Sequence, residues 1–111
     1  MLKRSYRLRK DRDFQKLYRT GRRYTTNHFV IYYLPSKFEF TQVGFVVSKK
    51  VSKSAVVRNK LRRRATAVIE EYYNELIPPK QIIVLIRKDF SLISPLDLKT
   101  ELNMLIGATK Q

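Results

Sequence analysis

The segment SKKVSKSAVVRNKLRRRATAVIEEY, residues Ser48 to Tyr72, joins a basic run to an apolar helical pattern. Its first seventeen residues, Ser48 to Arg64, hold eight Lys or Arg and no Asp or Glu. A helix beginning near Ala55 to Arg58 is predicted by apolar residues at helical spacing, namely Leu61, Ala65, Val68, Ile69, Tyr72 and Leu76. The start of a helix is already partly positive, so this placement of charge is unfavourable unless an anion binds there.

Two predicted strands flank this helix. Residues 40–48, FTQVGFVVS, precede it, and residues 81–87, QIIVLIR, follow it after Pro78 and Pro79. The second strand is apolar almost throughout, which is typical of a strand covered on both faces. The segment from Phe40 to Arg87 therefore predicts a strand–helix–strand crossover within an α+β sandwich.

The remaining elements complete the order αββαβα. Residues 11–20 predict a short helix that Asp11 caps and Gly21 ends in the left-handed conformation. Residues 28–34, HFVIYYL, predict a strand that we expect to pair with residues 40–48 as an antiparallel hairpin. A last helix begins at the cap Ser94, with Pro95 and Asp97 in its first turn, and ends at Gly107.

Size and composition indicate one globular domain over residues 1–111, with 43% hydrophobic residues. The absence of Cys excludes disulfides and thiolate metal sites. No apolar run reaches 18 residues, and the first ten residues do not look like a signal peptide. We therefore expect a soluble, cytoplasmic protein that does not bind a membrane.

The charge is large and unevenly distributed along the chain. Twenty-four Lys and Arg against nine Asp and Glu give a net charge of +15. Residues 1–23 carry ten basic side chains and residues 48–64 carry eight, whereas residues 65–111 are almost balanced, with five basic and six acidic. Such an excess favours a polyanionic partner, first nucleic acid and second an anionic membrane surface.

The outer face of the basic helix suits phosphate. Advancing about 100° per residue from a buried Leu61 places Asn59, Arg62, Arg63 and Thr66 outside, flanked by Arg58, Lys60 and Arg64. Guanidinium groups bind phosphate in a bidentate manner, and the helix start adds backbone N–H donors. The alternative, a merely solvated helix face, is less favoured because acidic neighbours are missing from the segment.

A second constellation is aromatic. Phe14, Tyr18 and Tyr32 can stack on unpaired bases beside a basic track. That track contains Arg12, Lys16, Arg19, Arg22 and Arg23. The alternative is that Phe14 and Tyr18 are simple core residues, and their spacing alone favours this alternative.

Motifs for catalysis are missing from the sequence. His28 is the only histidine, and a single His in a strand is usually structural. Asp11 and Asp13 lie where capping explains them. No phosphate-binding loop, dinucleotide fingerprint or metal-ligand set is present, so we predict no catalytic residue in this chain.

At Arg58-Asn59-Lys60-Leu61-Arg62-Arg63 the sequence resembles the bacterial ribonuclease P protein component, whose RNxxKR core follows a KK…A segment, here Lys49-Lys50 and Ala55. The resemblance extends to residues 8–21, LRKDRDFQKLYRTG, and to both apolar strands. Three positions depart from the family pattern: Arg62 replaces Lys, Thr66-Ala67 replace Arg-Glu, and Ser52 replaces Gly. Part of the outer-face contact is then expected to be lost or moved to Arg64.

This resemblance implies a fold like the second domain of ribosomal protein S5, with a left-handed βαβ crossover. It implies a subunit of a ribonucleoprotein endonuclease that removes the 5′ leader from precursor tRNA during tRNA maturation. In that family the RNA subunit holds the active site and uses Mg²⁺. The implied partners are ribonuclease P RNA and precursor tRNA, and the sequence leaves the oligomeric state open.

The same resemblance implies two sets of RNA-binding residues. Those assigned to the catalytic RNA are Lys49, Lys50, Lys53, Arg58, Asn59, Lys60, Arg62 and Arg63. Those assigned to the cleft for the precursor tRNA leader are Arg12, Phe14, Lys16, Tyr18 and Tyr32. Two alternatives stay open from composition: a structural RNA-binding protein such as a ribosomal protein, and a DNA-binding module with the basic helix in the major groove.

Overall fold

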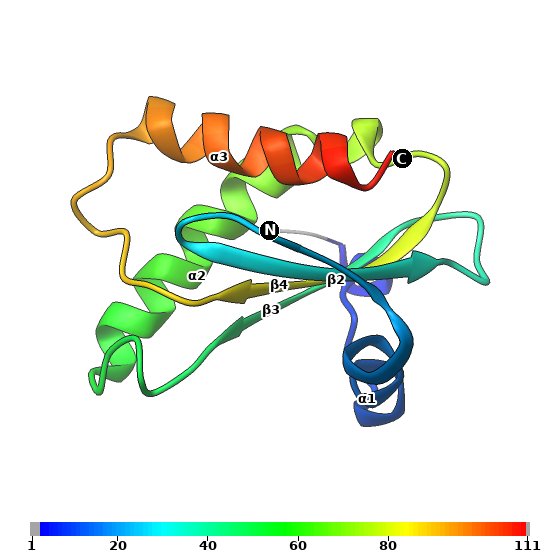
Figure 1. Ribbon diagram of the computed structural model, residues 1–111, viewed down its shortest axis with the longest axis horizontal. Helices are drawn as coiled ribbons and strands as arrows, with labels where there is room; N and C mark the ends of the chain where they lie inside the picture. The colour runs from blue at the N-terminus through cyan, green and yellow to red at the C-terminus, as the bar shows by residue number, and fades with distance from the viewer. Residues whose placement is uncertain (1–2, 111) are drawn as a thin grey trace.

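The computed structural model describes residues 3–110 and shows an α+β fold, as predicted (Figure 1). The helices are α1 (Asp11–Thr20), α2 (Ala55–Glu71) and α3 (Pro95–Ala108), with short 3₁₀ turns η1 (Arg4–Tyr6) and η2 (Tyr73–Glu75). The strands are β1 (Arg22–Thr25), β2 (Phe29–Pro35), β3 (Gln42–Val47) and β4 (Lys80–Ile86). Within residues 3–110, no helix combines the length and the apolar character needed to span a bilayer.

The four strands form one sheet in the order β1-β2-β4-β3. Strands β3 and β4 are parallel neighbours joined through α2, so the predicted crossover is confirmed. The predicted hairpin between residues 28–34 and 40–48 is wrong, because β4 lies between β2 and β3 and pairs with both. A strand that is apolar on both faces buries most apolar surface at the centre of a sheet. The free energy of this burial outweighs the closeness of β2 and β3 in the chain.

Strand β4 carries core residues on both of its faces. Ile82, Val84 and Ile86 belong to the large core between the sheet and the two long helices. Ile83 belongs to a smaller core with Leu17 of α1 and with Leu8. Helices α2 and α3 therefore cover one face of the sheet and α1 covers part of the other (Figure 1).

The large core confirms the apolar patterns read from the sequence. Leu61, Ala65, Val68 and Ile69 of α2 are buried, as are Leu98, Leu102 and Leu105 of α3. In β2, Phe29, Ile31 and Tyr33 face this core, while Tyr32 and Leu34 pack against the smaller one. The two phenyl rings of Phe29 and Phe90 lie 5.2 Å apart between their centroids and join the sheet to the loop before α3.

Helix α1 packs close to the sheet because β3 has a glycine beneath it. A Cβ atom added at Gly44 would lie 2.7 Å from a carbon of the Phe14 ring, a distance too short for carbon atoms. Gly44 thus allows the Phe14 ring to rest directly on β3. Leu17, one turn further along α1, is fully buried against Ile83.

Strand β1 was not predicted from the sequence. Its four residues, Arg22 to Thr25, are all exposed and lack the apolar alternation that indicates a strand. Pairing with β2 from Arg22↔Tyr33 to Thr25↔Val30 makes it an edge strand. The chain order therefore contains one strand more than the predicted αββαβα.

Helix ends agree with the sequence in part. Ser94 caps α3 through a hydrogen bond from the Asp97 N–H, as predicted. Asp11 is the first residue of α1 and not its cap, since Lys10 occupies the cap position. Gly21 has a φ of −72° and Gly107 lies inside α3, so neither is a left-handed helix end.

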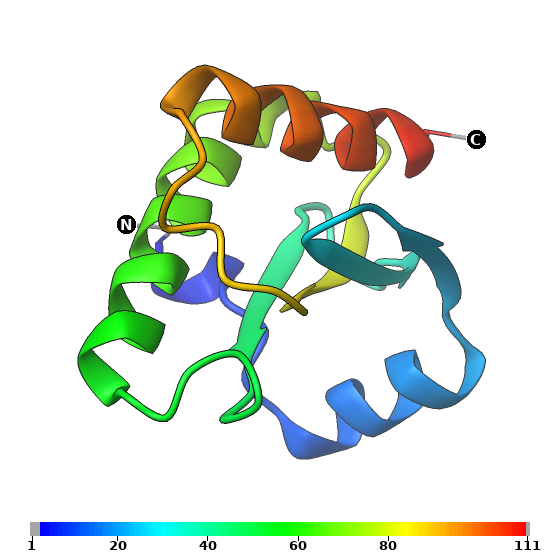
Figure 2. The same ribbon diagram turned by 60° about the vertical axis from the view of Figure 1, so that its left-hand side comes forward.

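The N-terminal segment runs along the outer edge of β3 (Figure 2). The Leu8 N–H donates to the Val43 carbonyl at 3.0 Å, next to a parallel bridge between Arg7 and Val43. Leu8 is buried in the smaller core, which anchors this segment between α1 and α2. An open sheet edge is thereby covered, and the basic residues around Leu8 are placed beside the helices.

The single histidine has a structural role. Its backbone N–H donates to Glu101 Oε2 and its ring Nδ1 lies 2.8 Å from Glu101 Oε1. The Thr26 hydroxyl also donates to this carboxylate. Burial alone would raise the pKa of Glu101, but these hydrogen bonds from Thr26 and His28 outweigh it and hold that pKa below its usual value.

We predict that Glu101→Gln destabilises the protein in a pH-dependent manner. A lowered carboxyl pKa stabilises the fold fully above the unfolded pKa of about 4.3, and this contribution is lost as the pH falls through the folded pKa. The free energy of unfolding should fall by about 1–3 kcal/mol at pH 7. Urea unfolding at pH 7 and pH 3 measures the difference, which should shrink at pH 3; exposed Glu39→Gln is the control. A difference that does not change with pH would contradict this assignment.

Candidate RNA interface

The basic turn before α2 is held in place by the helix itself. Lys49, Lys50 and Lys53 are exposed in the turn between β3 and α2. Ser54 caps α2 by accepting a hydrogen bond from the Val57 N–H at 3.3 Å. Half-buried Arg58 donates from Nη1 to the Ser52 carbonyl at 2.8 Å. Arg58 therefore fixes the lysine-bearing turn against the positive end of the helix.

Further along α2, the predicted outer face is present as a shallow hollow. Its lining consists of Asn59, Arg62, Arg63, Thr66, Ala67 and Glu70. The structure thus brings Asn59, Arg62 and Arg63 together as the helical spacing predicted, while exposed Lys60 lies outside this lining. The Thr66 hydroxyl donates to the Arg62 carbonyl and so stays close to the helix. The short side chains of Thr66 and Ala67 therefore leave room beside the two arginines.

Arg64 has a different role from the one predicted. Its Nη1 and Nη2 donate to the carbonyls of Phe90 and Ile93 at 3.1 and 2.9 Å, and its guanidinium lies 5.4 Å from the centroid of the Phe90 ring. These hydrogen bonds contradict a move of the outer-face contact to Arg64, and the other expected outcome, loss of part of that contact, stays a prediction. Arg64 points to the loop between β4 and α3 because its position is about 60° from the buried Leu61 stripe.

A second groove joins the outer face of α2 to the N-terminal segment. It is lined by Arg7, Leu8, Arg9, Val43, Gly44, Phe45, Arg62 and Thr66. Arg7 and Arg9 were absent from the residues predicted for the site, although they belong to the basic run of residues 1–23. Only the pairing of this segment with the edge of β3 places them beside Arg62, and sequence spacing carries no signal for that contact.

Part of the predicted aromatic constellation is brought together on the other face of the sheet. The rings of Tyr18 and Tyr32 meet edge to face with centroids 5.0 Å apart, and the Arg23 guanidinium lies 5.9 Å from the centroid of Tyr32. Tyr18 is 43% exposed, so the core alternative does not hold for it. Burial, followed by the neighbouring Tyr32, raises the pKa of the Tyr18 phenol, which keeps it neutral at physiological pH.

Phe14 packs as a core residue, which is one of the two roles that the sequence left open, and its stacking role stays a prediction. It is half-buried against Gly44 and packs on the smaller core, so it contributes to stability. The basic residues Arg12 and Lys16 of the same helix are exposed. The first helix therefore presents cations and one tyrosine to solvent while Leu17 fixes it on the sheet.

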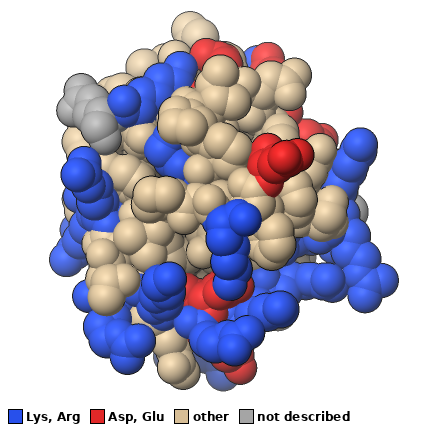
Figure 3. All heavy atoms as spheres, turned by 90° about the vertical axis from the view of Figure 1, so that its right-hand side faces the viewer, with Lys and Arg blue, Asp and Glu red and all other residues tan. Residues whose placement is uncertain are grey.

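Charge gathers on the α1 side of the molecule. On the face shown in Figure 3, the Lys and Arg side chains crowd the lower part, where α1 lies in Figure 1, and the upper part, where α3 lies, is mostly uncharged with both signs present. This agrees with the near balance of charge in residues 65–111. Neighbouring cations of this number form a surface to which a polyanion is attracted over several ångströms.

Comparison with known proteins decides the family. The family model for ribonuclease P matches residues 2–110. This chain belongs to that family. It is 37% identical to the ribonuclease P protein component of Bacillus velezensis over 109 residues, covering 97% of this chain and 92% of the relative. It is 40% identical to the Clostridioides difficile component over 81 residues, covering 73% and 70% of the two chains.

Solved structures show the same fold. The ribonuclease P protein of Staphylococcus aureus superposes with a TM-score of 0.83 at 29% identity, covering 95% of each chain. The chain is accordingly a protein subunit of bacterial ribonuclease P, and membership implies association with ribonuclease P RNA and a role in endoribonuclease activity. The basic surface of α2 and the aromatic pair of Tyr18 and Tyr32 are therefore candidate contacts of a ribonucleoprotein subunit.

We predict that replacing both Arg62 and Arg63 by Ala weakens binding to ribonuclease P RNA and reduces its salt dependence. Each phosphate contact contributes about 0.7 to 0.9 to the slope of log affinity against log salt, so the slope should become shallower by about 1.5. Filter binding between about 50 and 500 mM salt measures both effects.

Arg64→Ala is the contrasting variant. It removes two hydrogen bonds to carbonyls inside the fold, so the free energy of unfolding should fall by about 1–3 kcal/mol while the salt slope of the folded protein is unchanged. A flat salt response in the unmodified protein, or an equal change of slope in the two variants, would contradict this division.

Proposed function

We propose that this subunit binds the catalytic RNA through the start of α2 and holds the 5′ leader of precursor tRNA at the aromatic cleft. Binding at both places promotes endonucleolytic removal of the leader during tRNA maturation. The observation that carries this proposal is the placement of the two surfaces on α2 and α1, which cover opposite faces of one sheet. A single molecule can therefore contact two RNA segments at once.

The contact with the catalytic RNA is electrostatic. Asn59, Arg62 and Arg63 offer amide and guanidinium donors along one hollow, and Lys49, Lys50 and Lys53 add charge beside the capped helix start. Lys60 extends the charge on the same helix, and Arg58 holds the lysine turn in position. Such donors bind RNA phosphates without reading sequence, which suits recognition of a folded RNA by its shape.

The leader is single-stranded, so its bases are free to stack. Tyr18 and Tyr32 form an aromatic corner with Arg23 above one ring, and Arg12 and Lys16 are exposed on the same helix as Tyr18. Phe14 packs on the same small core as Tyr32 and supports the corner from beneath. Stacking on aromatic faces accepts any base, which a subunit acting on leaders of differing sequence requires.

The chemistry of cleavage is assigned to the RNA subunit, where Mg²⁺ bound through RNA phosphates would supply the activated water. Among residues 3–110, no group of three or more His, Asp or Glu side chains offers a metal site. The contribution proposed for this chain is to neutralise phosphates where the two RNAs approach each other and to position the leader. That contribution should matter most at low Mg²⁺, where fewer metal ions screen the repulsion between the phosphates of the two RNAs.

Reconstitution tests the proposed function. We predict that the protein restores 5′ cleavage of precursor tRNA by a bacterial ribonuclease P RNA at low Mg²⁺, where the RNA alone is slow. A structural RNA-binding protein or a DNA-binding module would bind nucleic acid without this rescue. Cleavage by rigorously RNA-free protein would instead move the chemistry onto this chain and contradict the assignment.

We predict that Tyr18→Ala or Tyr32→Ala in the reconstituted enzyme weakens precursor tRNA binding by about tenfold, as expected for the removal of one base–aromatic stack. Mature tRNA has no leader, so its binding should change by less than about twofold. Exposed Tyr24→Ala, which lies on β1, is the control. Equal losses for precursor and mature tRNA would argue against a stacking role in the cleft.

A further inference from the structure

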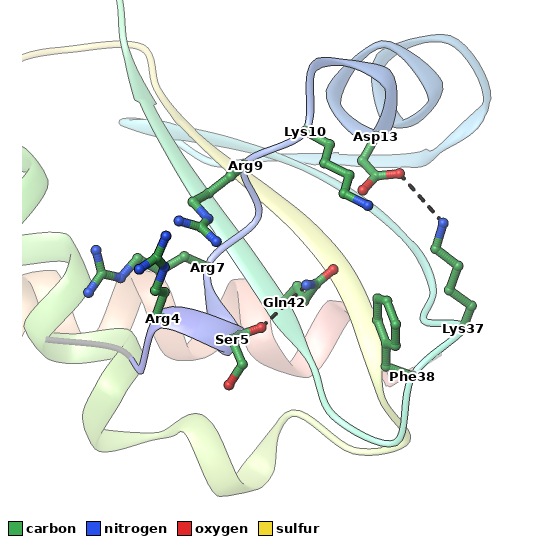
Figure 4. A pocket seen from close by; sticks show the side chains of 9 residues that line it. All are labelled: Arg4, Ser5, Arg7, Arg9, Lys10, Asp13, Lys37, Phe38 and Gln42. Carbon is green, nitrogen blue, oxygen red and sulfur yellow. Dashed lines mark hydrogen bonds and ion pairs between the residues drawn. The ribbon is translucent and has the colours of Figure 1, made fainter.

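A third basic hollow lies beside the N-terminal segment, outside the residues assigned above. Its lining consists of Arg4, Ser5, Arg7, Arg9, Lys10, Asp13, Lys37, Phe38 and Gln42. Figure 4 shows these side chains arriving from the N-terminal segment, the first turn of α1, the loop between β2 and β3, and the start of β3. Segments far apart in the chain thus meet around one opening.

The charge of this hollow is strongly positive. Five Lys or Arg side chains line it against one carboxylate, Asp13, which is 7% exposed. Asp13 lies 3.8 Å from the Lys37 Nζ in a loose ion pair, so it offsets only part of the positive charge. Arg9 and Lys10 both line this hollow, with Lys10 extending on the side of Asp13 and Arg9 lying on the side of Arg7 and Arg4 (Figure 4). An anion placed there would relieve the mutual repulsion of these cations.

A column of neighbouring aromatic rings supports one wall of this hollow. Phe38 stacks on Phe40 at 5.2 Å between centroids, Phe40 lies 5.4 Å from Tyr6, and Tyr6 stacks on Tyr73 at 4.5 Å. The Tyr73 hydroxyl donates to the Thr41 carbonyl, which anchors the inner end of the column. At the outer end Phe38 is 43% exposed and its ring points into the hollow (Figure 4). Phe38 is therefore an exposed aromatic wall of the hollow, backed by the ring of Phe40.

The floor of the hollow is fixed by amide groups. Gln42 Nε2 donates to the Ser5 carbonyl at 3.3 Å, and Gln42 Oε1 accepts a hydrogen bond from Gln81 Nε2 at 3.2 Å. The first bond holds the start of β3 against η1, and the second holds it against β4. A hollow with an aromatic wall, a fixed floor and a cationic rim has the parts that bind a base and a phosphate together.

We propose that this hollow binds one nucleotide of a single-stranded RNA segment, with its base stacked on Phe38 and its phosphate between Arg9 and Lys10. The inference rests on the proposed function only in taking RNA as the partner. Duplex RNA does not present base faces, so stacking on Phe38 requires an unpaired nucleotide. Lys10 precedes Tyr18 by about two turns of α1, which separates this hollow from the aromatic cleft by about 12 Å of helix.

Titration of the full chain with a single-stranded RNA hexanucleotide tests the site directly. Binding should shift the amide NMR signals of Lys10, Phe38 and Gln42, and Phe38→Ala should weaken the affinity measured at these signals by about tenfold. Phe38→Tyr, which retains a stacking face, should stay within about twofold. Tyr24→Ala is the control of similar exposure on β1, and thermal unfolding confirms that each variant is folded.

Lys10→Ala leaves the aromatic column intact and removes one phosphate contact. It should reduce the salt slope of hexanucleotide binding at these signals by about 0.7. Inorganic phosphate titrated at the same concentrations separates anion binding from nucleotide binding. If phosphate reproduces every shift and Phe38→Ala has no effect, the hollow is an anion site only and the proposal is overturned.

Two further titrations identify which RNA supplies the nucleotide. If Phe38→Ala weakens binding to ribonuclease P RNA alone, that RNA occupies the hollow; if it weakens only precursor tRNA binding by the assembled enzyme, the leader does. Unchanged affinity in both, with normal rescue of cleavage by Phe38→Ala, overturns the inference and leaves the proposed function standing. Failure of the unmodified protein to rescue cleavage would contradict the proposed function, while the hexanucleotide titration would still decide the site.

Discussion

Burial of β4 on both faces is the constraint on which the rest of the structure depends. Ile82, Val84 and Ile86 require cover from α2 and α3, and Ile83 requires cover from α1. One strand therefore determines that helices lie on both faces of the sheet. Because α1 and α2 are also the most basic helices, the same packing separates the positive charge into surfaces that face different directions.

The arginines of α2 divide into two kinds according to where the helix turns them. Arg58 and Arg64 donate to backbone carbonyls of the Ser52 turn and of the loop after β4, so they hold the fold around the helix. Arg62 and Arg63 line the outer hollow and are exposed. A contiguous basic motif thus combines positioning of the turn and loop with an open phosphate-binding face.

The N-terminal segment connects the basic surfaces. Its bridge to Val43 and the burial of Leu8 fix it along the edge of β3. Arg7 and Arg9 line both the groove that leads to α2 and the hollow that ends at Phe38. Bound RNA would therefore meet nearly continuous positive charge from the outer face of α2 to the first turn of α1, consistent with a subunit of a ribonucleoprotein.

The sequence alone determined the α+β class, the crossover helix with its buried stripe, and the outer-face grouping of Asn59, Arg62 and Arg63, because these follow from local periodicity. It also determined the Ser94 cap, because capping depends on local side-chain chemistry. It also located the ribonuclease P family through its basic motif. Only the tertiary structure decided that β4 separates β2 from β3, that polar β1 forms an edge strand, and that Arg64 binds a loop. It likewise brought Arg9, Lys10 and Phe38 around one hollow. Pairing and contact between distant segments depend on how all the apolar faces are buried together, and no local pattern encodes that.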